Sequence, residues 1–151
     1  MVKIILLFIL LSTSNIFGQF SFESFLSESF TYTLSSIKSN LADKKIEEKE
    51  VMNYKAVMYY DWLDPISIKV GYLFSSEGTQ KGKIIANAKK KEEDAVKLFS
   101  AAKNFLTKKY GNEFSENSMR GMTFINWKGV EDFSIVLTHK GDKTMVTVLK
   151  N

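Results

Sequence analysis

EEDAVKLFSAAKNFLTKKYG, residues 92–111, is the stretch with the clearest structural signal in this sequence. Its apolar residues recur at spacings of three and four, as the buried face of an α-helix requires. Three acids open the stretch, two lysines close it and Gly111 follows, which are the usual terminal signals of a helix. We therefore predict a helix from Glu92 to Tyr110, with this buried face: Leu98, Ala101, Ala102, Phe105 and Leu106.

Three strand-like runs follow this helix, at residues 122–127, 133–139 and 143–149. The second run alternates between apolar and polar residues, and the third is rich in β-branched residues. Glycine-containing turns at 128–129 and 140–142 separate the runs. The second half of the chain therefore predicts one helix followed by three strands.

The first half has a similar pattern. Leu34, Ile37 and Leu41 have helical spacing, and because Phe30 to Leu34 also alternates like a strand, we predict a helix from about Thr33 only. The predicted strands that follow are 51–62, 66–74 and 83–89. Alternation in these strands predicts a face toward the helices made of Tyr54, Met58, Tyr60, Ile68, Val70 and Tyr72, with Trp62 on the same side.

The two halves match as an internal repeat. Leu34 corresponds to Leu98 and Lys45 to Lys109, both at an offset of 64, while Trp62 corresponds to Trp127 at an offset of 65. The repeats span about 30–89 and about 92–150. The predicted fold is therefore α+β, with two tandem αβββ units that form an antiparallel sheet with helices packed on one face.

Two consecutive αβββ units in a small exported chain resemble the beta-lactamase inhibitory protein and related PepSY-like periplasmic proteins. The resemblance is one of pattern and covers most of residues 20–151. It implies a sheet with helices on one face and a partner-binding surface on the other. No motif aligns binding residues, so none are carried over.

The N-terminus has the order of a secretory signal peptide. Lys3 precedes an apolar run of eight residues, 4–11, and small and polar residues lead to Gly18 and Gln19. A membrane-spanning helix needs roughly 20 apolar residues, so we expect no stable membrane anchor. We predict a signal peptide at 1–19, a single domain at 20–151, and a periplasmic or secreted location.

The amino-acid composition limits the classes of partner and cofactor that we expect. The chain has no cysteine, which excludes disulfides, thiolate metal sites and a lipidated cysteine. Without Lys3 the basic residues fall from 21 to 20, against 17 acidic ones, and this mild excess does not favour nucleic acid. We expect no nucleic-acid partner and no cofactor.

The residue pattern does not favour catalysis. His139 is the only histidine and follows an alternating strand, where a solvated side chain is the ordinary case. Asp61 and Asp64 flank Trp62, which would suit a sugar site, although a turn acid beside a core tryptophan explains the same pattern. No glycine-rich phosphate loop is present. We predict that the protein is not an enzyme.

Exposed aromatic residues among charged and hydroxyl groups are typical of contact surfaces. The predicted partner-binding residues are Lys55, Tyr59, Asp61, Ser67 and Lys69. The sequence therefore predicts an exported, non-enzymatic protein that binds a protein or a cell-envelope component through an exposed sheet face. The alternative is an envelope protein that holds a small apolar ligand between helices and sheet.

Overall fold

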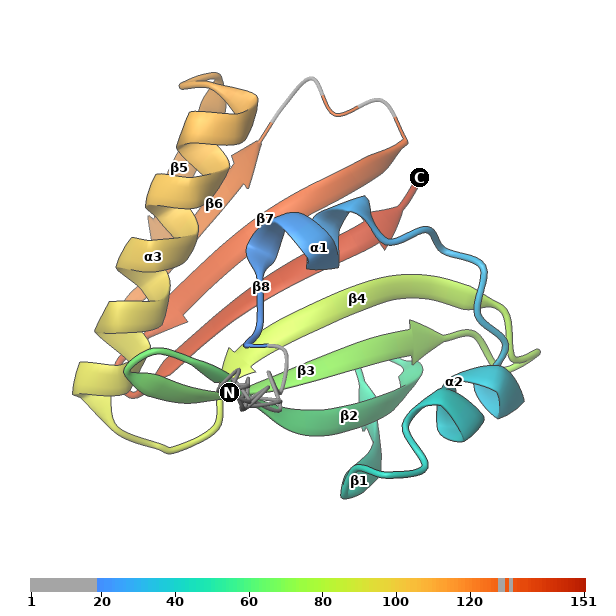
Figure 1. The fold of residues 1–151 in the computed structure, drawn as a ribbon. Coiled ribbons are helices and arrows are strands. Elements are labelled where there is room, and N and C mark those ends of the chain that lie inside the picture. The colour runs from blue at the N-terminus through green and yellow to red at the C-terminus, as the bar shows by residue number, and fades with distance from the viewer. Residues whose placement is uncertain (1–18, 128–129, 131) are drawn as a thin grey trace, which may run out of the picture.

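The computed structural model describes residues 19–127, 130 and 132–151. These residues form one eight-stranded antiparallel sheet with three helices, which confirms the predicted α+β class (Figure 1). The predicted signal peptide lies, apart from Gln19, outside the described residues. In chain order the elements are α1 (Phe22–Ser27), α2 (Leu34–Asn40), β1 (Ile46–Val51), β2 (Tyr54–Leu63), β3 (Ile66–Phe74), β4 (Gln80–Asn87), α3 (Glu92–Tyr110), β5 (Phe114–Met119), β6 (Met122–Trp127), β7 (Phe133–Lys140) and β8 (Lys143–Lys150).

The strands lie in the order β1-β2-β3-β4-β8-β7-β6-β5, so β4 and β8 pair at the centre and β1 and β5 are the edges. The prediction of αβββ units was wrong, because four strands follow α2 and four follow α3. The two unpredicted strands are the edges. β1 carries four consecutive charged residues, 47–50, which suit an exposed edge and resemble a solvated connection in the sequence.

Two tight turns explain the missed strand boundaries. Met52 and Asn53 have φ values of 50° and 67°, and Arg120 and Gly121 have 51° and 74°. Positive φ at both central residues of a two-residue loop is the conformation that joins antiparallel strands tightly. Met-Asn and Arg-Gly are weaker signals of such a turn than Asn-Gly, so the predicted strand 51–62 ran through the first of them.

The helices agree in part with the prediction. The bounds of α3 are confirmed, and α2 begins as predicted after Thr33, whose side chain forms a reciprocal capping box with Ser36. The prediction missed α1, which has six residues and is capped by Ser21. No helix among the described residues is long and apolar enough to cross a membrane.

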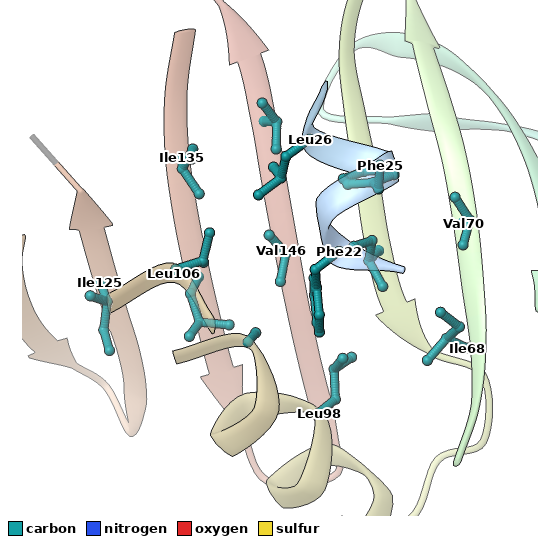
Figure 2. Close-up of a cluster of buried hydrophobic side chains, with 14 of the residues drawn as sticks. Phe22, Phe25, Leu26, Ile68, Val70, Leu98, Leu106, Ile125, Ile135 and Val146 are labelled. Atoms are coloured by element: carbon teal, nitrogen blue, oxygen red, sulfur yellow. The ribbon is translucent and has the colours of Figure 1, made fainter. Parts of the chain in front are cut away.

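The main core lies on the sheet face to which Val70 points, which we call the Val70 face. Phe22 and Phe25 of α1 and Leu98 of α3 meet there above the central strands (Figure 2). A second cluster on this face holds α2 through Ile37. Besides these residues, the buried members of the two clusters are Leu26, Leu41, Val57, Ile66, Ile68, Tyr72, Phe74, Ile85, Ala102, Leu106, Ile125, Trp127, Ile135, Leu137, Val146 and Val148.

The opposite face has a smaller core, and we call it the Met58 face. Its buried cluster consists of Ala56, Met58, Leu73 and Ile84. The predicted face of β2 was therefore wrong, because Met58 points away from the main core while Val57 points into the cluster beneath α2. Two glycines make this packing possible: a Cβ on Gly71 or Gly82 would lie within 3 Å of neighbouring atoms.

Replacing Gly82 with alanine is expected to lower the free energy of unfolding by about 1–3 kcal/mol, because the added methyl overpacks the sheet centre. Its Cβ would lie 2.7 Å from the backbone oxygen of Val148, which cannot move without disturbing β8. Gly71→Ala is the matched comparison, since its closest contacts are the side chains of Met58 and Ile84. Chemical denaturation should show the smaller loss for Gly71→Ala, and a larger loss there would contradict the argument.

The predicted correspondence of Trp62 with Trp127 was also wrong. Trp127 is 2% exposed in the main core, whereas Trp62 is 47% exposed. In the second half of the sheet, directly paired residues form a row from Val148 in β8 through Ile135 in β7 to Trp127 in β6. The corresponding row through Ile85 and Val70 reaches Tyr59, and each row then ends on an edge strand, at Ile46 beside Tyr59 and at Phe114 beside Trp127. Tyr59 therefore holds in the first half the position that Trp127 holds in the second.

Candidate binding surfaces

The five predicted partner-binding residues do not lie on one surface. Lys55, Tyr59 and Asp61 share the Val70 face, because Tyr59 is paired directly with Val70 and Asp61 with Ile68. Ser67 and Lys69 lie on the Met58 face, where they are paired with Trp62 and Tyr60. The prediction thus combined residues from opposite sides of one sheet.

Tyr59 is a packed residue rather than the exposed contact that the sequence predicted. Its ring contacts both hydrophobic clusters of the Val70 face. The Nζ of Lys44 lies 4.6 Å from the centre of this ring. Burial, followed by the negative charges of Asp61 and Glu28, raises the pKa of the Tyr59 hydroxyl to about 12.

The Met58 face carries an ordered polar and aromatic surface at one end of β2 and β3. We call it the aromatic patch, and its residues are Glu47, Tyr60, Trp62, Ser67 and Lys69. The Glu47 carboxylate accepts hydrogen bonds from Tyr60 Oη at 2.7 Å and from Lys69 Nζ at 2.7 Å. Lys69 Nζ also lies 4.9 Å from the centre of the Tyr60 ring. Three strands thus hold these side chains in one arrangement.

The electrostatics of the aromatic patch are consistent with this pairing. The hydrogen bond from Lys69 lowers the pKa of the Glu47 carboxyl, and the same bond raises the pKa of the Lys69 ammonium. Both groups are therefore charged at neutral pH. Their charges offset one another, so the exposed rings rather than a net charge distinguish this surface.

Tyr60 and Trp62 are the exposed large side chains of the aromatic patch, at 43% and 47% exposure. The alternation of β2 predicted that both rings face the helices. The interpretation of Trp62 as a core residue was therefore wrong. A sugar site with two acids beside the indole is not assembled either, because Asp61 lies on the opposite face.

The sequence contained a signal for this face. Leu63 pairs with Ile66, so only Asp64 and Pro65 separate β2 from β3. A loop of two residues fixes the register of a hairpin, and directly opposed residues point to the same face. Ser67 and Lys69 were correctly assigned to the polar face of β3. The register therefore places their partners, Trp62 and Tyr60, on that face as well.

A cavity of about 410 Å³ lies on the Val70 face between α1 and strands β2 and β3. Glu28 reaches it from the end of α1, and its Oε1 accepts hydrogen bonds from Tyr32 Oη at 2.8 Å and Tyr72 Oη at 3.3 Å. Its wall is formed by Gln19, Phe20, Ser21, Ser24, Phe25, Glu28, Tyr59, Asp61 and Tyr72. Neither Glu28 nor the cavity was predicted, because α1 itself was not.

Lys83 is a fully buried lysine at the centre of the sheet, with 0% exposure. Its Nζ donates to the backbone oxygens of Phe25 and Glu28, and the second of these bonds is 2.6 Å long. These are carbonyls at the end of α1, where a helix leaves acceptors without intrahelical partners. Removal from water lowers the pKa of the Lys83 ammonium to about 8, although the nearby Glu28 charge opposes the shift.

His139 is held by structure rather than solvated, which corrects the sequence interpretation. Its Nδ1 lies 2.8 Å from Thr144 Oγ1, and its ring lies 5.1 Å from that of Phe99. Thr144 Oγ1 donates its only proton to the Ala95 oxygen at 2.7 Å. Nδ1 of His139 must therefore be the donor to Thr144. Within the described ranges no group of three His, Asp or Glu side chains could hold a metal ion.

Comparison with known proteins adds no assignment. No protein-family model, no curated protein and no solved structure matches the chain.

Proposed function

We propose that this protein binds another macromolecule through the aromatic patch of the Met58 face. The observation that carries the proposal is the pair of exposed rings, Tyr60 and Trp62, beside each other on one strand. Tyrosine and tryptophan supply much of the binding energy of known interfaces, because they offer large rigid surfaces at a low entropy cost. Glu47 and Lys69 hold the Tyr60 side chain in place before any partner arrives.

The arrangement of the helices supports the choice of face. We propose that all three helices pack on the Val70 face: Phe22 of α1 and Leu98 of α3 lie in its main cluster, and Ile37 of α2 lies in its second. The Met58 face is then the side on which a partner meets the sheet directly. The resemblance to the beta-lactamase inhibitory protein stays a prediction, and it also implies a partner-binding surface on the sheet face away from the helices.

We also propose that the chain arose by duplication, with a unit of one helix and four strands in place of the predicted αβββ unit. Two ion pairs support this proposal. Lys38 of α2 pairs with Glu48 of β1 at 2.7 Å, and Lys103 of α3 pairs with Glu116 of β5 at 3.0 Å. Each joins a helix to the edge strand of its own half.

The proposed site of action is outside the cytoplasm, and the proposed mode of action is binding without catalysis. The signal-peptide pattern of residues 1–19 supports export. The hydrogen-bonded arrangement of His139, with its Nδ1 proton directed at Thr144, supports a structural role for the chain's single histidine. The partner is a protein or a cell-envelope component.

Replacing Trp62 with alanine is expected to weaken capture of the partner at least tenfold while the fold stays intact. Truncation of an anchoring aromatic ring typically costs about 2 kcal/mol or more of binding energy, whereas an exposed residue contributes little to stability. The measurement compares proteins retained from the producer's envelope fraction by the immobilised wild type and by Trp62→Ala. Quantitative mass spectrometry identifies species that depend on the ring.

Met119→Ala is the matched control. Met119 is also a large exposed residue, at 64% exposure, but it lies on β5, the edge strand at the far end of the sheet from the aromatic patch. The proposal predicts that this variant retains the same species as the wild type. Equal capture by Trp62→Ala and wild type, or equal loss in both variants, would remove the aromatic patch as the binding surface.

Binding of a small molecule is the second candidate function. The cavity beneath α1 favours it, because ligand sites in proteins are concave and range from about 300 to 1,000 Å³. The sequence-based alternative was a small apolar ligand between helices and sheet. The cavity lies at that place, but two carboxylate side chains contribute to its wall.

A further inference from the structure

The cavity beneath α1 has the size and the access for a small ligand. Its volume of about 410 Å³ is at the lower end of the range for ligand sites. Ser21 and Ser24, both exposed residues near the start of α1, form part of its wall. A solute can therefore approach from the solvent without displacing the main core.

The charge of the cavity wall is negative. Among the described residues that form the wall, Glu28 and Asp61 are the two acidic side chains, and none is a lysine, arginine or histidine. Both carboxylates act on Tyr59 between them, since each contributes to its raised pKa. Lys44 and Lys83 do not line this wall, but their ammonium groups lie close to Tyr59 and Phe25 and offset part of its negative charge.

The rest of the wall is largely aromatic. Phe20, Phe25, Tyr59 and Tyr72 line the cavity. Two of these rings already bind an ammonium group of the protein itself: Lys44 Nζ lies 4.6 Å from the centre of Tyr59, and Lys83 Nζ lies 5.0 Å from that of Phe25. Aromatic rings attract cations through the negative potential of their faces, and the attraction strengthens where water is excluded.

We infer that this cavity is a binding site for a small organic ammonium ion, held by the carboxylates of Glu28 and Asp61 against the rings of Tyr59 and Phe25. Carboxylates alone would suit a metal ion, but the faces of the Phe25 and Tyr59 rings supply no ligand to a metal, and the described residues bring no third His, Asp or Glu to the site. An alkylated ammonium uses both components, because its charge meets the acids and its alkyl groups meet the rings. This site is on the Val70 face and is independent of the aromatic patch.

Calorimetric titration of the full chain with choline tests the inference. The matched probe is 3,3-dimethyl-1-butanol, which has the shape of choline without its charge. We expect choline to bind, and the neutral alcohol to bind at least tenfold more weakly. Equal affinity for both probes would mean an apolar site, and the absence of choline binding would overturn the inference directly.

Three carboxylate variants locate the site. Asp61→Asn is expected to weaken choline binding at least tenfold with the fold unchanged, because the Asp61 side chain accepts a hydrogen bond from the adjacent Trp62 N–H and an amide oxygen can still accept it. Glu28→Gln should weaken binding similarly. Glu23→Gln is the control on the same helix, since Glu23 pairs with Lys109 outside the cavity wall. Unchanged binding in Asp61→Asn would overturn the assignment even if Glu28→Gln failed to fold.

The ammonium group can belong to a free solute or to a lipid headgroup. Flotation with phosphatidylcholine vesicles separates these sources, with phosphatidylglycerol vesicles as the control. Flotation with the first and not the second, lost in Asp61→Asn, supports a lipid source. Choline binding without flotation supports a free solute. Equal flotation with both vesicles would show binding that the ammonium group does not direct, and would count against the site.

Discussion

Replacing Phe74 with alanine is expected to lower the free energy of unfolding by about 3–5 kcal/mol. Phe74 has 0% exposure and lies with Ile37 and Leu41 in the cluster beneath α2. Truncation leaves a cavity among residues from a helix and two strands, which relax only in part. The loss is a large share of the roughly 5–15 kcal/mol that stabilises an ordinary domain. Chemical denaturation followed by tryptophan fluorescence measures it.

Phe105→Ala is the comparison, and it should cost less than Phe74→Ala. From the sequence alone, Phe105 is an expected core residue with a cost of roughly 3–5 kcal/mol. In the structure its ring is only partly buried and stacks on Phe22 at a centroid distance of 5.3 Å. A larger loss of stability in Phe105→Ala than in Phe74→Ala would contradict the expectation that the fully buried ring contributes more than the partly buried one.

The stability of the wild type is expected to rise by about 2–3 kcal/mol between pH 7 and pH 10, because of Lys83. In the folded state burial lowers the pKa of the Lys83 ammonium to about 8, from its usual value of 10.5. Between these values the unfolded chain retains a proton that the folded chain has released. Stability increases with pH wherever the unfolded state binds more protons. Denaturation in guanidinium chloride at several pH values gives the curve.

Lys83→Met is the control, because it keeps the side-chain length and removes the titrating group. The free energy of unfolding of the wild type minus that of Lys83→Met should increase across this pH range, whichever protein is the more stable at pH 7. Above about pH 10 the trend should reverse in both proteins, since the pKa of Tyr59 is raised to about 12 and the folded state then retains the extra proton. Parallel curves for the two proteins below pH 10 would show that Lys83 is not the cause.

Interior elements were predictable from the sequence, and edges were not. The bounds of α3 and β3 match the prediction, because their apolar residues recur with the period of a half-buried helix or strand. The edge strands β1 and β5 bury little on either side, so they carry no apolar period. Charges along β1 prevent pairing with other chains, and they also conceal the strand.

The two candidate binding sites were also not predicted from the sequence, for reasons other than the exposure of edge strands. The aromatic patch depends on register, and an error of one residue in β2 exchanges Tyr59 with Tyr60 between faces. The two-residue loop at Asp64 and Pro65 held the information needed to avoid it. The cavity was not predictable in this way, because Glu28 and Asp61 are 33 positions apart and meet only through the packing of α1.

The position of β8 has a consequence for when the molecule can fold. β8, Lys143–Lys150, lies between β4 and β7, so it joins the two halves of the sheet although it follows the other seven strands of the described residues. While these residues are still inside the ribosome, the first four strands have no partner along their inner edge. Pairings so distant in sequence form slowly, because a long loop must close first. The sheet of the nascent chain therefore stays in two separate halves until Lys143–Lys150 have emerged and paired with both β4 and β7.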